Sequence, residues 1–228
     1  MFPFREKTTD KAKPTEWFAW SKAPSEAAST RRTISLSRGK AKAYVLIGDN
    51  IEPETDARVA AVCAESFIGK PSLKPIAFQT ILGFANNIVL ARRKPSVDFS
   101  YDAVCMFLFK NEAAWVISGN ASAILFVDGE PVRQSAEKVY PSIGSSPAYK
   151  AQAEGPFAMT QGETALLLSC GAPWTAEDAQ AIGAMLRGSE SPARWMERIL
   201  ERYPDQCTSA MTVFLPAPHR HASHESHA

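Results

Sequence analysis

The sequence predicts one α+β domain in which β-sheets are packed between helices. Short apolar runs bounded by polar or turn-forming residues are typical of buried strands, and two separate pairs of amphipathic stretches are typical of helices. These elements follow the order strand, two helices, several strands, two helices and a last strand. A length of 228 residues, with 45% hydrophobic and 21% charged residues, suits a single globular domain.

The first part of the chain predicts two strands and a helix pair. A short strand is predicted over residues 17–20, followed by a loop up to Arg32. Residues 43–47 form a continuous apolar run before a Gly-Asp-Asn sequence, which suits a strand buried on both faces. Helices are predicted over residues 55–68 and 75–91, because apolar residues recur there at spacings of three and four.

The middle of the chain predicts consecutive strands. Apolar runs cover residues 103–109, 113–118 and 121–127. An Asp-Gly pair after the third run predicts a hairpin, with residues 130–134 returning as a strand. No element is predicted between residues 135 and 160, where Ser-Ser-Pro and Glu-Gly-Pro are typical of loops.

The last part predicts a strand, two helices and a strand. Residues 164–169 form another buried-type strand, and Thr175 with Asp178 resembles a capping box at the start of a helix. A Ser-Pro pair at residue 191 begins the second helix, and residues 212–215 form the last strand. The predicted domain extends over residues 16–216, between a flexible segment at 1–15 and a flexible tail at 217–228 that contains all four histidines.

Charge and cysteine usage narrow the function classes. A net charge of +1 gives no reason to expect nucleic acid or an anionic membrane as a partner. No apolar run approaches the ~18 residues of a membrane-spanning helix, and the charged N-terminus does not resemble a secretory signal. The four cysteines are widely spaced and form no CxxC pair, so neither a zinc site nor a disulfide framework is indicated. We therefore expect a cytoplasmic protein.

Several short sequence motifs at predicted strand ends resemble those of one known family. The first is the Gly-Asp-Asn sequence at residues 48–50, which precedes a helix of small residues. The second is Ser-Gly-Asn-Ala at residues 118–121, which precedes a short strand and a glycine turn. The third is Leu-Leu-Ser-Cys-Gly-Ala-Pro-Trp at residues 167–174. A final hydrophobic strand follows Ser209. In this order they resemble the metal-binding strand ends of the PP2C-type (PPM family) serine/threonine protein phosphatases. The resemblance implies an αββα sandwich, with two antiparallel sheets flanked by helix pairs.

The resemblance also implies which residues occupy the family's metal-ligand positions. Asp49 matches the metal-bridging aspartate, whereas Asn120, Cys170 and Ser209 stand where further aspartates are expected. Asp205 lies close enough to compete with Ser209 for the last position. The sequence therefore indicates a degenerate ligand set.

The chemistry of these replacements bears on activity. The family mechanism uses two Mg²⁺ or Mn²⁺ ions to activate a bridging water for in-line attack on phosphate. Such hard cations prefer carboxylate oxygens, whereas Asn120 offers a neutral carbonyl, Cys170 a soft sulfur and Ser209 a neutral hydroxyl. We expect the two-metal centre to be lost or greatly weakened, with no cofactor and at most a vestigial single-ion site at Asp49.

Two other groups have competing interpretations. Arg31 and Arg32 would bind phosphate through their forked guanidinium groups, or they form a solvated loop pair. Cys170 resembles a nucleophile at a strand end, but no histidine outside the tail is available as a base, which favours a buried structural thiol.

The sequence thus favours a catalytically weak or inactive pseudophosphatase that acts through a protein partner, such as a phosphoprotein, in signalling or regulation. The alternative is an active, divergent Mn/Mg-dependent phosphatase that recruits Asp98, Asp102, Asp128 or Asp205. A scaffold protein is a third hypothesis, which predicts a large exposed apolar patch on a helix face or sheet edge.

Overall fold

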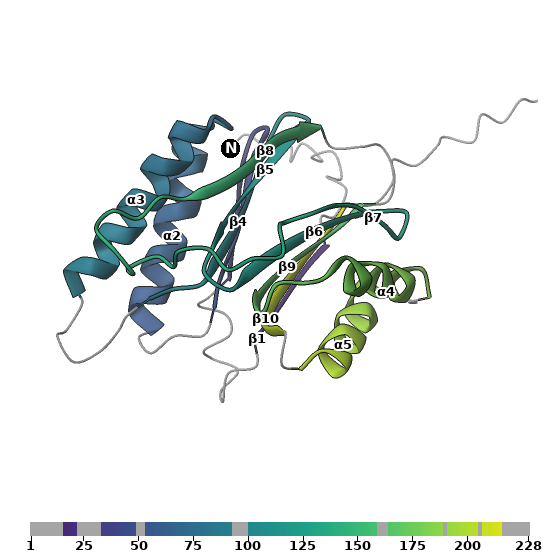
Figure 1. Cartoon of the computed structure of the whole chain (residues 1–228). Coiled ribbons are helices and arrows are strands. Elements are labelled where there is room, and N and C mark those ends of the chain that lie inside the picture. The colour runs from purple at the N-terminus through teal and green to yellow at the C-terminus, as the bar shows by residue number, and fades with distance from the viewer. Residues whose placement is uncertain are drawn as a thin grey trace, which may run out of the picture.

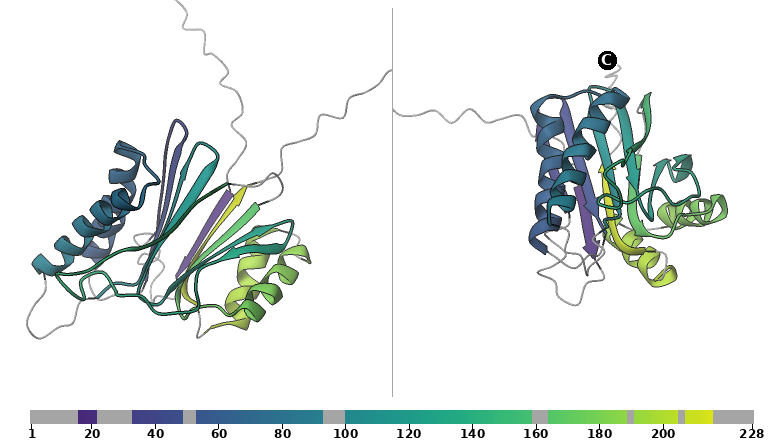
Figure 2. Two further views of the ribbon diagram at one scale, coloured as in Figure 1. Left: turned by 45° about the horizontal axis from the view of Figure 1, so that its top comes forward. Right: turned by 60° about the vertical axis from the view of Figure 1, so that its left-hand side comes forward.

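Two five-stranded antiparallel sheets face each other, and a pair of helices covers the outer face of each sheet (Figures 1 and 2). The computed structural model describes residues 16–21, 33–48, 53–92, 100–158, 164–188, 191–204 and 207–215. This is the predicted αββα arrangement. No helix among the described residues is long and apolar enough to cross a membrane.

The first sheet has the strand order β2-β3-β4-β5-β8. Its strands are β2 (Thr33–Arg38), β3 (Ala41–Ile47), β4 (Ala103–Phe109), β5 (Glu112–Ser118) and β8 (Gln152–Ala158). Helices α2 (Pro53–Gly69) and α3 (Pro75–Arg92) cover its outer face. Phe107 of β4 stacks on Phe67 of α2 and Phe78 of α3, with ring centroids 4.6 and 5.4 Å apart. The helix pair is thereby attached to the centre of the sheet.

The second sheet has the strand order β1-β10-β9-β6-β7. Its strands are β1 (Glu16–Ser21), β10 (Cys207–Leu215), β9 (Thr164–Gly171), β6 (Ala121–Val127) and β7 (Glu130–Gln134). Helices α4 (Ala176–Arg187) and α5 (Pro192–Arg202) cover its outer face. Trp195 of α5 meets Phe126 of β6 edge to face and donates its indole N–H to the Ile182 carbonyl of α4 at 3.1 Å.

A third apolar layer lies between the two sheets. It includes Met106 and Trp115 from the first sheet, and Leu168 and Met211 from the second. Because β3, β4, β6 and β9 also bury their other faces under helices, their side chains are buried on both sides. This explains why those strands have continuous apolar runs rather than an alternating pattern.

The helix caps and the hairpin turn in the structure are those that the sequence predicts. Thr175 and Asp178 form the predicted capping box at the start of α4, and Ser191 caps α5 before Pro192. Asp128 and Gly129 both have positive φ, at 51° and 78°, as a two-residue hairpin between β6 and β7 requires.

Two strands were not predicted, and one begins earlier than predicted. β2 and β8 are edge strands with many polar and partly exposed positions, so neither shows an apolar run. β8 also contains Gly155 and Pro156, which are tolerated at a sheet edge but are typical of loops in a sequence. β10 begins at Cys207 rather than at residue 212, because its first residues pair with β9 despite their polar character.

Candidate functional site

Five residues meet at one end of the sandwich, where strands of both sheets end or begin. Gly48 follows β3, Asp102 precedes β4, Asn120 links β5 to β6, Cys170 lies near the end of β9 and Ser209 near the start of β10. Cys170 pairs with Ala121 on one side and with Ser209 on the other. We call these five residues the end cluster.

Gly48 lies where the two sheets approach each other. Its backbone N–H donates to the Asp102 carbonyl at 2.7 Å. A Cβ added to Gly48 would lie 3.1 Å from the Cβ atoms of both Asp102 and Cys170. One side chain from each sheet therefore contacts the same glycine, which leaves little space between them.

The turn that contains Asn120 is held to both sheets. The Asn120 carbonyl accepts a 2.7 Å hydrogen bond from the Gly171 backbone N–H. The preceding Gly119 has a φ of 67°, and a Cβ there would lie 1.8 Å from Asp102 Oδ1. Gly119 is thus required both by the backbone conformation and by the closeness of the Asp102 carboxylate.

Asp102 is the described carboxylate of the end cluster, and protein groups surround it. Its Oδ1 accepts a hydrogen bond from the Ser142 hydroxyl at 3.3 Å. Burial raises the pKa of the Asp102 carboxyl, while hydrogen bonds from the Asn120 backbone, Ser142 and the Asn120 side chain act in the opposite direction. The donors of the protein therefore stabilise the charge of this half-buried carboxylate.

The loop that supplies Ser142 is itself anchored near the cluster. The Tyr140 N–H donates to the Gly119 carbonyl at 3.2 Å, and the Ile143 N–H donates to the Ser118 hydroxyl at 3.0 Å. Tyr101 and Ile143 form an isolated β-bridge. Ser142 is consequently held beside Asp102 by backbone contacts on both sides of it.

Cys170 and Ser209 are buried on the inner face of the second sheet. Cys170 is 1% exposed and packs in the apolar layer between the sheets, as expected for a structural thiol. Ser209 is 0% exposed and lies directly across the β-ladder from Cys170. Trp174, in the loop between β9 and α4, is also buried, and its indole N–H donates to the Ser169 hydroxyl at 2.5 Å.

The structure brings together three of the residues that the resemblance singled out: Asn120, Cys170 and Ser209. Asp49, Arg31 and Arg32 lie outside the described residues, as do Asp98 and Asp205 of the alternative hypothesis. Asp128 is exposed in the β6–β7 turn, at the opposite end of β6 from Asn120. At ~3.3 Å per residue the two ends of β6 are roughly 20 Å apart, which excludes Asp128 from the end cluster.

Asp102 is the site residue that was least expected from the sequence, where it was only one of four aspartates in the alternative hypothesis. A signal was nevertheless present. An aspartate directly before a buried strand is at a strand end, where side chains from neighbouring strands converge. Recognising this required the pairing of β4 with β3 and β5, which places Ala103 opposite both Ile47 and Ser118.

The described donors of the end cluster do not match two hard dications. They comprise one carboxylate held by protein donors, one amide, one buried thiol and one buried hydroxyl, from Asp102, Asn120, Cys170 and Ser209. Among the described residues, no three His, Cys, Asp or Glu side chains are grouped so that they could hold a metal ion. Mg²⁺ and Mn²⁺ sites are normally built from several carboxylates and carbonyl oxygens.

Solved structures with a similar architecture identify the fold. A serine/threonine phosphatase of S. agalactiae aligns with a TM-score of 0.66 at 7% identity, covering 90% of this chain and 100% of that chain. The catalytic domain of the serine/threonine protein phosphatase PstP, solved with two manganese ions, aligns with a TM-score of 0.63 at 13% identity, covering 89% and 98%. The fold is that of the PP2C-type phosphatases. PppA, described as a key regulatory component of T6SS in Pseudomonas aeruginosa, shares this fold with a TM-score of 0.55 at 14% identity, covering 89% and 96%.

At the level of sequence, no family model and no curated protein matches the chain. The structural comparisons nevertheless confirm the fold that was inferred from the strand-end motifs. The PP2C-like fold is what this chain shares with the phosphatases. The end cluster lies where the strands of this PP2C-like fold converge, so its donor chemistry is the basis for a functional proposal.

Proposed function

We propose that this chain is a PP2C-like domain with a degenerate metal site, which is catalytically weak or inactive and acts by binding a protein partner in signalling or regulation. The observation that supports the proposal is the donor set of the end cluster. Cys170 and Ser209 are buried side by side where carboxylates would be needed, and Asp102 is already hydrogen-bonded by Asn120 and Ser142.

Electrostatics supports this interpretation. Two bound dications bring four positive charges, which anionic ligands must largely balance. When bound, such ions activate a water and stabilise the charge that develops on a transferring phosphoryl group. Among the described residues of the end cluster, Asn120 and Ser209 are neutral and Cys170 is buried in an apolar layer, so these three positions supply little of the balancing charge.

A protein-binding role is consistent with what one solved relative of the fold is described as doing. PppA is described as a key regulatory component of T6SS. We propose by analogy that the PP2C-like domain of this chain acts in regulation by binding another protein. The partner expected here is a protein, with a phosphoprotein as one candidate class.

A second candidate is an active, divergent metal-dependent phosphatase. The observation that favours it is the position of Asp102, a carboxylate inside the end cluster and next to Asn120. Mg²⁺ is often held by only one or two carboxylates together with substrate phosphate oxygens. In this candidate, Asp49 and Asp102 would share one ion.

The decisive experiment measures Mn²⁺-dependent hydrolysis of p-nitrophenyl phosphate and Mn²⁺ binding by calorimetry with the full chain. We expect no metal-dependent turnover and no binding tighter than that of a surface carboxylate. The double variant Asn120→Asp with Cys170→Asp adds two carboxylates and should bind Mn²⁺ at least about tenfold more tightly than the unmodified chain.

Robust turnover by the unmodified chain would refute the proposal. Tight Mn²⁺ binding that is abolished by both Asp49→Ala and Asp102→Ala would favour the second candidate, and metal-dependent turnover lost in the same variants would establish it. A circular dichroism spectrum and a thermal unfolding curve for each variant show whether a loss of binding reflects misfolding.

A further inference from the structure

The outer surface of the α2–α3 helix pair has an apolar groove whose cationic residues lie at its ends. One hollow, of about 540 Å³, is lined by Arg58, Val62, Phe84, Asn87, Ile88, Ala91 and Arg92. A second, of about 390 Å³, continues from it and is lined by Ser66, Lys70, Ser72, Ile76, Ala77, Thr80, Ile81 and Phe84. Phe84 lines both hollows, so they form one continuous surface, which we call the α2–α3 groove.

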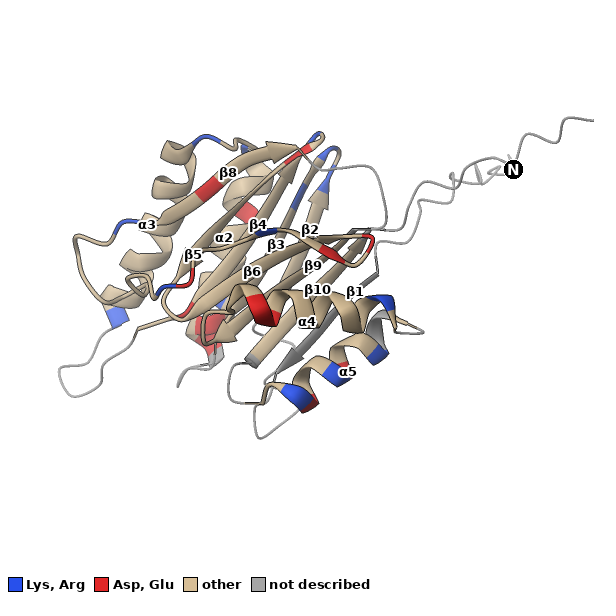
Figure 3. Cartoon of the chain, turned by 45° about the vertical axis from the view of Figure 1, so that its right-hand side comes forward, with Lys and Arg blue, Asp and Glu red and all other residues tan. Residues whose placement is uncertain are grey.

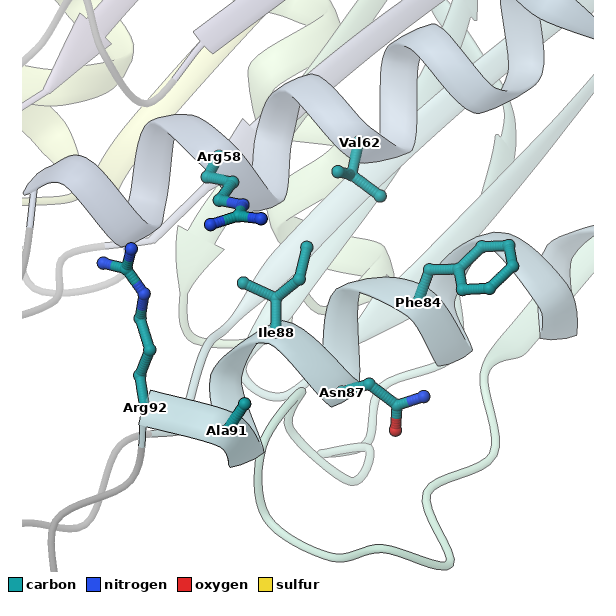
Figure 4. A pocket seen from close by; sticks show the side chains of 7 residues that line it. All are labelled: Arg58, Val62, Phe84, Asn87, Ile88, Ala91 and Arg92. Carbon is teal, nitrogen blue, oxygen red and sulfur yellow. The ribbon is translucent and has the colours of Figure 1, made fainter.

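The helical spacing explains the shape of the α2–α3 groove. Its α2 residues, Arg58, Val62 and Ser66, recur every four positions and so form one stripe along the helix. Figure 4 shows Arg58 and Val62 extending from α2 toward α3, and Ile88 extending from α3 toward α2. The faces that pack on the sheet consist mainly of other residues, such as Cys63, Phe67 and Phe78, and Ile81 and Ile88 of α3 contribute to both sides. The groove therefore lies on the side of the helix pair that is turned away from the sheet.

The surface composition of α3 is unusual for a helix in an outer layer. It has no charged residue between Pro75 and Ala91, and Ile76 and Phe84 are 70% and 56% exposed. In the opposite layer, the exposed positions of α5 include Arg194, Glu197 and Arg198. Figure 3 shows this contrast, with blue and red positions along α5 and a largely tan α3. An exposed, uncharged helix face with large apolar side chains is typical of a surface that binds another protein.

We propose that the α2–α3 groove binds an amphipathic helix of a partner protein, with an apolar face that covers Phe84 and Ile76 and acidic residues that meet the cations at the groove ends. Among the described residues that line the groove, the charged ones are Arg58 and Arg92 at one end and Lys70 at the other, and none is acidic. This arrangement complements a helix with a leucine-rich stripe and carboxylates near its ends.

Neither the N-terminal segment nor the helices of the second layer offer such a helix. Residues 1–15 have four basic and two acidic side chains, so they do not complement the cations of the groove. The apolar residues of α4 and α5, including Ile182 and Trp195, are buried against their own sheet. A separate acidic partner therefore fits the groove better than a terminal segment or a second copy of this chain. The proposal deepens the protein-binding part of the proposed function, but it would hold equally for an active phosphatase.

The test uses fluorescence anisotropy with the full chain and a labelled helical peptide of about 18 residues, the length of α3. The peptide has leucines along one face and glutamates flanking them, and a matched peptide has lysine in place of every glutamate. We expect the glutamate peptide to bind at least about tenfold more tightly than the lysine peptide. Phe84→Glu should weaken its binding by at least about tenfold, because it removes the central apolar contact.

A charge reversal and a surface control make the test specific. Arg58→Glu should weaken binding of the glutamate peptide and strengthen binding of the lysine peptide, whereas Val139→Glu, at an exposed apolar position outside the groove, should change neither. Binding of neither peptide, equal binding of both, or binding that Phe84→Glu leaves unchanged would each overturn the proposal. So would a concentration-dependent dimer that Phe84→Glu abolishes, since a second copy would then be the occupant. Metal-dependent turnover, if present, should be the same in Phe84→Glu and the unmodified chain, so the two proposals fail separately.

Discussion

Asp102 shows how the end cluster balances opposing forces on one side chain. Burial disfavours its charged form and raises its pKa, whereas Asn120 and Ser142 donate hydrogen bonds that favour the charge. The same donors would compete with a cation for the carboxylate oxygens. We therefore expect Asp102 to be a poor ligand by itself.

At the same scale, Gly119 is expected to be intolerant of any side chain. Gly119→Ala should lower the free energy of unfolding by about 2–3 kcal/mol, because the φ of 67° is strained for alanine and the new Cβ collides with Asp102 Oδ1. Urea unfolding monitored by tryptophan fluorescence measures this loss.

Gly39 is the matched control for Gly119. It has a φ of 58°, but a Cβ there meets nothing within 4 Å, so Gly39→Ala should cost only about 1 kcal/mol. In an Asp102→Ala background the extra cost of Gly119→Ala should largely disappear. Equal losses for the two glycine variants would show that the contact with Asp102 is unimportant.

At the scale of elements, α4 is held against the β6–β7 hairpin by close backbone contact. Arg187 of α4 donates to the Gly129 carbonyl at 2.9 Å and forms an ion pair with Glu130 at 2.5 Å. Gly183, one turn earlier in α4, would place a Cβ 2.4 Å from the Gly129 carbonyl oxygen. The helix approaches the hairpin closely because Gly183 has no side chain.

Two glycines in helix interiors should therefore respond oppositely to the same substitution. Gly183→Ala should destabilise the protein by about 2 kcal/mol or more, since α4 must move away from the hairpin. Gly83→Ala in α3 should stabilise it by about 0.5–1 kcal/mol, because nothing lies within 4 Å of the added Cβ and alanine favours helix. Chemical denaturation of both variants tests this, and a gain in stability for Gly183→Ala would contradict the packing described here.

At the scale of the whole molecule, the apolar layer between the sheets should make the stability of the folded state fall at alkaline pH. Burial raises the pKa of Tyr44 in β3 to about 12, from 10.0. The folded state therefore keeps this proton at pH values where the unfolded chain loses it. The contribution of Tyr44 to stability is complete below pH 10 and declines as the pH rises toward 12.

The variant Tyr44→Phe isolates this effect. Between pH 10 and 12 it should lose less unfolding free energy than the unmodified chain, with a difference on the order of 2 kcal/mol at the upper end. Urea titrations at several pH values measure the difference. Parallel losses in the two proteins would mean that Tyr44 ionises freely in the folded state.

Local sequence patterns were sufficient to predict most elements and the fold class. These patterns can be recognised within a window of a few residues. They are the apolar runs of β3, β4, β6 and β9, the helix periodicities and the caps at Thr175 and Ser191. The order of the strand-end motifs was sufficient to predict the PP2C-like fold, which the structural comparisons confirmed.

The folded structure was needed to find the edge strands β2 and β8, the place of Asp102 beside Asn120, and the α2–α3 groove. Each of these depends on pairing or packing between segments that are far apart in the chain, such as β5 with β8 or α2 with α3. A local pattern records whether a residue is buried, but it does not record which distant residue buries it, because that choice is made by the packing of the whole chain.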